Sequence, residues 1–472
     1  MKNLRSVRRP CGSGASEDPG SHGLCVPAAV APGPRGSWLL GSAAEFRRNP
    51  LQLFQNGTEQ YGDVVRFRLA HVIVHLLNHP RHVQQVLRSP SAGFDRRSRS
   101  AGKIRAVCGN SLLTSHGEDW KAQRRMLQTA MHPGTAFDPR PAIDAAVRSM
   151  LRGWEMAANL RQPIDLTSEM QHVTFAIAAQ VIFGFTPTSE DLVVMERCLS
   201  EVLEHTWQRL EKLLDLETVF PFLAGRRFRT ALAELDEVVL RIIRQPRKSG
   251  GPSSDVLSVL FRSCGVRNDT AADCRQLRDH VLTLLLSGHE TTASALTWAL
   301  ILLARHPAVQ DQLREELAND GQDRRLALRV FQETIRLYPS IWVMERRVIR
   351  DEVAGGFRIP AGSSVVICPW LLHRHREFWD APETFDPDRF LPRNQAERPE
   401  SVYLPFGAGP HRCIGQHLAT LIAREIIARV VTACRLTPVS RELPPAVPGI
   451  TLRHRQPVQV IAEFPERKAR QA

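Results

Sequence analysis

A single long helical pattern dominates the middle of this chain. It runs from about Arg278 to Arg305 and stops before Pro307, a residue type that cannot continue a helix. Helical patterns also fill most of the stretch from about residue 80 to about residue 340. The sequence therefore predicts a mostly helical protein.

Short strand patterns lie on both sides of the helical region. Residues 65–69 alternate apolar with basic side chains, which is typical of a half-buried strand. Four more strands are expected at Val72–Leu76, Phe357–Ile359, Ser364–Cys368 and Val458–Phe464. The predicted fold class is thus mostly α with a minor β lobe.

The first 30 residues differ from the rest in composition. They are rich in Gly, Ser, Pro and Ala, which predicts a disordered N-terminal extension before a single domain at residues 31–472. No run of 18 apolar residues occurs, so we expect no membrane anchor. The nine cysteines are odd in number and lack a CxxC pair, which favours free thiols in a reducing cytoplasm over disulfides or a zinc site.

The chain is strongly basic, with a formal net charge of +13. One interpretation is a basic face for an acidic protein partner, and the other is an arginine-rich solvated surface. Nucleic acid is not expected as a partner, because the basic residues are dispersed and no zinc-finger spacing is present.

Cys413 lies in a glycine-containing loop, Phe406–Gly415. A thiolate that binds iron needs its charge stabilised. Gly407 and Gly409 permit a tight turn whose N–H groups point at one sulfur, and a helix beginning just after the loop would direct its positive end there. His411 could pair with an anionic group of a ligand. The loop alone fits a buried structural cysteine equally well.

The long helix contains an unfavourable segment for a helix interior, Ser287–Thr292. A glycine costs about 1 kcal/mol there, and two adjacent threonines are poor helix formers. Gly288 removes a side chain where a flat ligand would pass. Glu290 and Thr291 form an acid–alcohol pair that could relay protons through water. The alternative is a kinked core helix whose threonine hydroxyls bond to its own carbonyls.

Two further motifs are weak in isolation. Glu333 and Arg336 share one helix face, as many exposed ion pairs do. Trp120 and Arg124 also share a face, which fits an ordinary amphipathic helix.

Taken in order, these elements resemble the cytochrome P450 family over about residues 32–465. The loop matches the family's Phe-Gly-x-Gly-x-x-x-Cys-x-Gly signature, except that His411 stands where most members have Arg. The helix segment resembles the Ala/Gly-Gly-x-Asp/Glu-Thr-Thr/Ser motif, with Ser287 as the departure. The Glu-x-x-Arg, Trp-x-x-x-Arg and Pro-x-Arg-Phe elements follow the family's order and spacing.

The resemblance implies the P450 fold and a haem b cofactor whose iron is ligated by Cys413. It assigns further haem contacts to Phe406, Gly288, Trp120, Arg124, Arg346 and His411. Arg347 is a second candidate for the place of Arg346. The resemblance also implies that Glu290 and Thr291 deliver protons during oxygen activation. The residues implied to form a buried structural charge network are Glu333, Arg336 and Arg389.

The implied function is a monooxygenase of secondary metabolism that inserts one oxygen atom of O2 into a C–H bond. Its substrate is expected to be a lipophilic small molecule, such as a terpenoid, a fatty acyl chain or a polyketide. The pocket would be lined from residues 95–113, Leu285–Thr292, Ile341–Met344 and the surroundings of Ile450.

No flavin or iron–sulfur reductase is fused to the sequence, which ends about 60 residues after Cys413. We therefore expect electrons from a ferredoxin or flavodoxin with its NAD(P)H-dependent reductase, docking near basic residues such as Arg412. The expected setting is the cytoplasm of a bacterium.

Two other functions stay open at this point. One is a haem-thiolate enzyme that uses peroxide or needs no O2, against which the Glu290–Thr291 pair argues, since such an enzyme needs no proton relay. The other is a non-enzymatic haem sensor, which the absence of an attached signalling domain disfavours.

Overall fold

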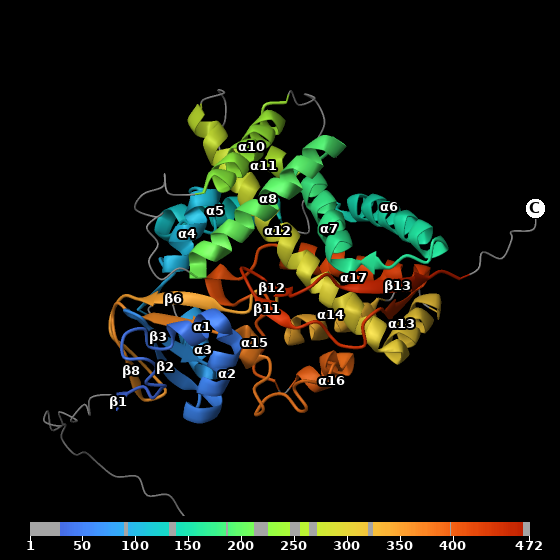
Figure 1. Cartoon of the computed structure of the whole chain (residues 1–472). Helices are drawn as coiled ribbons and strands as arrows, with labels where there is room; N and C mark the ends of the chain where they lie inside the picture. Colours follow the sequence, from blue (N-terminus) through green and yellow to red (C-terminus); the bar gives the residue numbers. More distant parts are fainter. Residues whose placement is uncertain are drawn as a thin grey trace, which may run out of the picture.

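The computed structural model describes nine segments of the chain, residues 29–88, 93–131, 138–185, 187–211, 225–245, 255–263, 271–319, 324–396 and 398–465. Helices form most of it; the strands within residues 29–95 and 344–367 gather in a smaller lobe beside them, and the strands from residue 435 onward lie among the helices (Figure 1). Residues 1–28, which hold most of the expected disordered extension, lie outside the described residues.

The described helices span a wide range of lengths. Their bounds are α1 Ala43–Arg48, α2 Pro50–Tyr61, α3 Pro80–Arg88, α4 Arg99–Cys108, α5 Gly117–Ala130, α6 Arg140–Asn159, α7 Leu166–Phe183, α8 Ser189–Glu211, α10 Arg226–Ile243, α11 Val256–Ser263, α12 Ala271–Arg305, α13 Pro307–Asn319, α14 Arg325–Leu337, α15 Pro369–Leu372, α16 Pro392–Gln395 and α17 Gln416–Ala433. Three short 3-10 helices are η2 Pro387–Phe390, η3 Glu400–Val402 and η4 Gly409–His411.

The described strands form four small sheets. Their bounds are β1 Ala29–Val30, β2 Val64–Leu69, β3 Val72–Leu77, β4 Phe94–Asp95, β5 Ile164–Asp165, β6 Met344–Val348, β7 Glu352–Ala354, β8 Phe357–Ile359, β9 Ser364–Ile367, β10 Arg435–Pro438, β11 Ala446–Pro448, β12 Leu452–His454 and β13 Gln459–Glu463. The largest sheet has the order β2-β3-β9-β6-β4, and the others have the orders β1-β8-β7, β10-β13-β5 and β11-β12.

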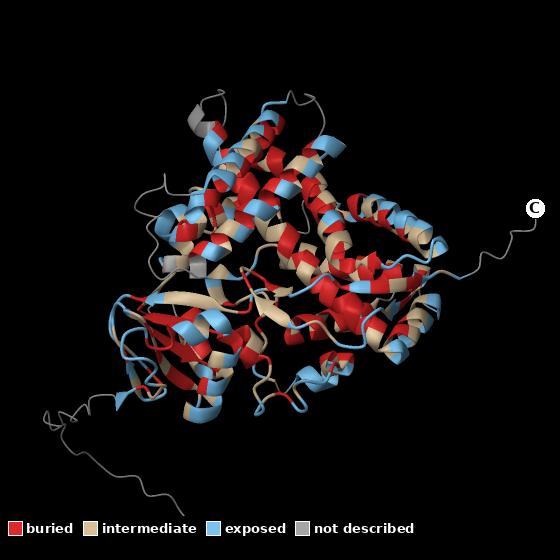
Figure 2. Cartoon of the chain, viewed as in Figure 1, coloured by how far each residue is buried: buried red, intermediate tan, exposed pale blue. Residues whose placement is uncertain are grey.

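Helix α12 runs through the centre of the helical part and ends at Arg305, as the sequence predicts. It begins at Ala271, seven residues before the predicted start. Its main neighbour is α7, which is mostly buried over its second half, residues 173–183 (Figure 2). The buried residues of this pair belong to the largest apolar core.

The five predicted strands are confirmed, each to within one residue at both ends. One prediction at the N-terminus is wrong by two residues, because Ala29 and Val30 form β1 and pair in parallel with β8. Predicted strand ends differ from the observed ones because a terminal residue counts as strand only if it pairs with another strand, and the local sequence pattern does not show which strand that is. Among the described residues, none of the helices combines the length and the apolar character that a membrane-spanning segment needs.

Candidate functional site

The loop before α17 is shaped by two glycines with positive φ. Gly407 and Gly409 both have φ of 69°. A Cβ atom on Gly409 would lie 2.0 Å from the carbonyl oxygen of Leu87 in α3, so no other residue fits there without displacing backbone. The Cys413 N–H donates to the Phe406 carbonyl at 2.9 Å, which closes the loop around the cysteine.

The side chain of Cys413 is exposed, although backbone groups of the protein approach its sulfur. The side chain is exposed, unlike the other cysteines of the described part, which are buried. The backbone N–H groups of Gly415 and Gln416, at the start of α17, hydrogen-bond to the sulfur and lower its pKa, as do the charges of Arg124 and Arg412. Desolvation is the larger effect and raises the pKa of the thiol. The N-terminal end of α17 thus directs N–H groups at the sulfur, as expected from the sequence.

A group of three arginines lies next to this loop. The guanidinium of Arg96 lies 3.0 Å from Nδ1 of His411, and the ring of His411 contacts that of Trp120, with centroids 3.9 Å apart and planes tilted by 49°. Arg124 donates to the Arg412 carbonyl at 2.6 Å. Arg346 belongs to the same group, because the positive charge of Arg96 acts on it and lowers its pKa. The structure therefore brings together four of the predicted haem contacts.

This arginine cluster, Arg96, Arg124 and Arg346, is not neutralised by a direct ion pair within the described part of the chain, and the charges of Glu345 and Asp95 act on Arg346 less strongly than burial and Arg96 do. No carboxylate of the described residues forms an ion pair with any of the three. Burial, followed by repulsion from Arg96, lowers the pKa of Arg346 to about 10. Burial and the same arginines lower the pKa of His411 to about 3, so its imidazole is neutral. Uncompensated buried cations are costly, and the cluster therefore suits a ligand with two carboxylates.

The choice between Arg346 and Arg347 follows from strand geometry. Neighbouring residues of β6 point to opposite faces of the sheet. Arg346 is half-buried and faces the arginine cluster, whereas Arg347 is exposed. Arg346 is therefore the residue that can reach a ligand anion.

The unfavourable segment of α12 is helical throughout, and its hydroxyl groups bond within the helix. The Thr291 hydroxyl donates to the Ser287 carbonyl at 2.7 Å, and the Ser287 hydroxyl donates to the Thr283 carbonyl at 2.6 Å. A Cβ atom on Gly288 would meet only the Cβ of Ala178, at 4.0 Å. Gly288 thus leaves room for a small side chain next to α7, and the contact with a flat ligand stays a prediction.

Glu290 does not pair with Thr291 in the way the sequence suggested. Its carboxylate is buried and accepts hydrogen bonds from the Thr451 hydroxyl at 2.8 Å and from Nε of Arg453 at 2.6 Å. Arg453 in β12 also lies 3.7 Å from Glu204 of α8. The acid therefore ties α12 to β12. Glu290 and Thr291 are adjacent in sequence but diverge on the helix surface, because neighbours in a helix do not face each other.

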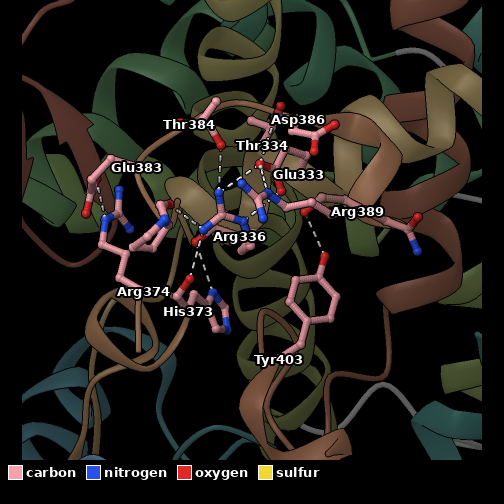
Figure 3. A network of polar contacts seen from close by, with 12 residues as sticks. Glu333, Thr334, Arg336, His373, Arg374, Glu383, Thr384, Asp386, Arg389 and Tyr403 are labelled. Atoms are coloured by element: carbon pink, nitrogen blue, oxygen red, sulfur yellow. Dashed lines mark hydrogen bonds and ion pairs between the residues drawn. The ribbon is translucent and has the colours of Figure 1, made fainter. Parts of the chain in front are cut away.

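Glu333, Arg336 and Arg389 form the predicted buried charge network (Figure 3). Glu333 and Arg336 are fully buried and joined by two hydrogen bonds of 2.7 Å. The guanidinium also donates to the carbonyls of His373 and Pro382, at 2.9 and 2.7 Å. Arg389 lies 3.4 Å from the Glu333 carboxylate. The network joins α14 to the irregular segment that leads to the cysteine loop.

Several residues of this site were not found by sequence reasoning. Arg96 was hidden in a run of arginines without distinguishing spacing. The partners of Glu290 are Thr451, just before the short strand β12, and Arg453 within it; no sequence motif marks them. Conversely, Trp342, expected near a pocket, is buried in a separate apolar core and donates to the Gly449 carbonyl at 2.9 Å.

Together, these features fit an iron porphyrin that carries two carboxylates. One exposed thiol accepts hydrogen bonds from backbone N–H groups, three neighbouring arginines form no ion pair with a carboxylate of the described residues, and Gly288 leaves room beside α12. The family model described as Cytochrome P450 matches residues 31–462. The chain belongs to the cytochrome P450 family. It is therefore a haem-binding monooxygenase that uses O2, a lipophilic substrate and redox partners.

Three curated relatives of this chain come from bacteria of the genus Streptomyces. Cyclooctatin synthase of Streptomyces melanosporofaciens is 33% identical over 92% of this chain and 93% of its own. Cyclooctat-9-en-7-ol 5-monooxygenase of the same organism is 32% identical, over 88% and 89%. Pentalenene oxygenase of Streptomyces avermitilis is 28% identical, over 84% and 89%.

Among solved structures, retinoic acid bound cyanobacterial CYP120A1 is similar, with a TM-score of 0.77 at 23% identity. The match covers 93% of this chain and all of that one. The predicted family, fold class and haem cofactor are thereby confirmed.

Proposed function

We propose that this P450 hydroxylates a cyclic terpenoid hydrocarbon or a partly oxidised derivative of one. The support comes from two relatives, a cyclooctat-9-en-7-ol 5-monooxygenase and a pentalenene oxygenase, whose names refer to oxygenation of terpenoid compounds, and the first of them exceeds 30% identity over most of the chain. A fatty acyl chain and a polyketide, the other substrates considered from sequence, have no comparable support among the three Streptomyces relatives.

Cys413 is proposed to ligate the haem iron. The observation that carries this assignment is the exposed Cys413 side chain, whose sulfur accepts hydrogen bonds from the N–H groups of Gly415 and Gln416. Once bound, a thiolate-ligated haem would favour cleavage of the O–O bond and oxygenation of a C–H bond. The N–H groups offset part of the desolvation that raises the pKa of the thiol, and so favour the thiolate that the iron would bind. Phe406 accepts the Cys413 N–H and so holds the loop in place.

The arginine cluster is proposed to hold the two propionates. Arg96, Arg124 and Arg346 provide positive charge in a partly desolvated place, where ion pairing is stronger than in water. His411 stays neutral beside them and accepts a hydrogen bond from Arg96 at Nδ1, so its Nε2–H could donate to a propionate without adding charge. The departure from the family's usual Arg at position 411 is compensated here by Arg96, 3.0 Å away.

Thr291 is proposed to hand protons to the oxygen-binding side of the haem. Its hydroxyl donates to the Ser287 carbonyl, so this proton is released only when the bond is exchanged for one to water or ligand. Glu290 would contribute only after its carboxylate is freed from Arg453 and Thr451. Proton delivery by this acid therefore requires a rearrangement of β12 relative to α12.

Electrons are proposed to come from a separate ferredoxin or flavodoxin with an NAD(P)H-dependent reductase, in a bacterial cytoplasm. Arg412 is exposed directly beside the cysteine loop, and the net charge of +13 favours an acidic partner. The six cysteines of the described part are all free, which is typical of proteins in a reducing compartment.

The haem ligand is tested by the carbon monoxide difference spectrum of the reduced protein. The wild type is expected to give the red-shifted band of a thiolate ligand, and Cys413→Ala is expected to lose it. Cys434→Ala is a matched control, since Cys434 is buried at the other end of α17. A thiolate-type band that persists in Cys413→Ala would refute the assignment.

The substrate class is tested by titrating a cyclic diterpene hydrocarbon, a sesquiterpene hydrocarbon and a long-chain fatty acid. A conversion of the haem from low to high spin is expected with a terpene and not with the fatty acid. The reverse order would refute the terpenoid proposal. Turnover with peroxide alone, but not with O2 and a ferredoxin system, would favour the peroxide-using alternative.

A further inference from the structure

The loop Gly36–Gly41 exposes three large apolar side chains in a row. Trp38 is 89% exposed, Leu39 is 61% exposed and Leu40 is 42% exposed. Single exposed apolar residues are common on protein surfaces, but a contiguous group that includes a tryptophan marks a contact site. Trp38 is the most exposed large apolar side chain of the described residues.

This exposure is built into a firmly held loop. The guanidinium of Arg68 donates to the carbonyls of Ser37, Trp38 and Leu39, at 2.5, 2.8 and 2.9 Å. Ser37 and Gly41 also exchange two backbone hydrogen bonds, of 2.9 and 2.8 Å. Arg68 thus supplies hydrogen-bond donors to three carbonyls of the turn from the protein side. The apolar side chains of the turn are directed outward.

The flanks of the loop are basic. Arg35 lies just before it, and Arg47 and Arg48 end the helix α1 that follows it. All three are exposed, and no ion pair to any of them occurs in the described part of the chain. Glu45 is the acidic residue of this stretch. An apolar knob with a basic rim is complementary to a bilayer that carries anionic lipids.

We propose that the loop Gly36–Gly41 is a peripheral membrane contact. Trp38, Leu39 and Leu40 enter the interfacial region of a bilayer, where tryptophan is favoured, and the flanking arginines contact anionic headgroups. The contact is reversible, because three side chains bury far less apolar area than a membrane-spanning helix. If the proposed terpenoid function is right, the enzyme would be held where its lipophilic substrate accumulates.

Two other occupants fit this surface less well. In a symmetric dimer the same patch meets itself, which would bring the basic rims of two copies together. A patch of three side chains is also small beside the ~800 Å² per partner of a stable interface. Residues 1–28 carry four basic and two acidic side chains, so their charge has the same sign as the rim.

The experiment is vesicle flotation of the intact holoprotein. The vesicles are phosphatidylcholine alone and phosphatidylcholine with 30% phosphatidylglycerol, each at low and high salt. The variants are Trp38→Ser with Leu39→Ser, and Arg47→Gln with Arg48→Gln. The matched control is Met156→Ser with Leu160→Ser, two apolar side chains that are each 67% exposed on and beside α6. The carbon monoxide spectrum shows that each variant is folded.

We expect the wild type to float with the anionic vesicles and to be released by salt. The apolar variant should partition at least tenfold more weakly, the arginine variant should lose the preference for anionic vesicles, and the control should behave as wild type. Absence of binding at low salt, or equal binding of the apolar variant, overturns the proposal. A concentration-dependent dimer that the apolar variant abolishes would overturn it in favour of a second copy. None of these outcomes depends on the terpenoid assignment.

Discussion

Removing the carboxylate of Glu333 should destabilise the protein far more than its local sequence motif suggests. Arg336 is fully buried, and Glu333 supplies the only carboxylate that contacts it among the described residues. Glu333→Ala removes two charge-assisted hydrogen bonds of 2.7 Å and leaves the guanidinium with backbone carbonyls alone. Breaking a buried pair from one side costs about 3–5 kcal/mol, because a desolvated charge remains.

The free energy of unfolding is measured by urea titration with far-UV circular dichroism, at equal haem content. Glu333→Gln keeps the side-chain volume and separates the loss of charge from the creation of a cavity. Glu118→Ala is the matched control, because Glu118 and Lys121 form a pair with the same i, i+3 spacing at 2.7 Å but are exposed. That control should show no measurable change.

A loss below about 1 kcal/mol in Glu333→Ala would refute the reasoning. It would mean that water or a rearranged backbone solvates Arg336 as well as the carboxylate does. The cation–π contact of Arg336 with Trp379, at 5.0 Å, and the hydrogen bonds to carbonyls would then be sufficient to hold the charge.

Three further predictions concern other parts of the molecule. Arg453→Gln should lower the free energy of unfolding by about 1–3 kcal/mol, since the buried Glu290 keeps only the Thr451 hydroxyl, and Arg453→Lys should recover part of this in urea titrations. Gly409→Ala should lower haem incorporation, measured by the carbon monoxide spectrum, because its Cβ would meet the Leu87 carbonyl; Gly62→Ala, with a positive φ but no neighbour within 4 Å, should not. Stability should fall as the pH drops below about 6.5, because burial lowers the folded-state pKa of five histidines outside the cysteine loop to about 4 or 3, while the unfolded chain takes up protons near the ordinary pKa. These are His75, His280, His289, His373 and His454. Each should cost about 1.4 kcal/mol per pH unit between roughly pH 6 and 4, and an unfolding free energy that stays constant from pH 7 to 5 would contradict this.

The sequence by itself determined the elements that depend on neighbours along the chain. The end of α12 at Arg305 follows from Pro307, and the positive φ of Gly407 and Gly409 follows from a turn that other residues resist. The Cys413 loop could be recognised for the same reason, since ten consecutive residues make it. Such features are local, so spacing and residue type are sufficient to predict them.

Only the tertiary structure decided which distant side chains meet. Glu290 bonds to Arg453, 163 residues away, a partner that the sequence did not indicate. Arg96 joins His411 across 315 residues, and no motif marks it. A buried charged side chain is stabilised by the polar groups of whichever element packs against it, because an unpaired buried charge is costly. A sequence neighbour on another face of the same helix cannot provide that stabilisation. The packing of β12 and of the chain after β4 against the helical core therefore set the electrostatics of the site.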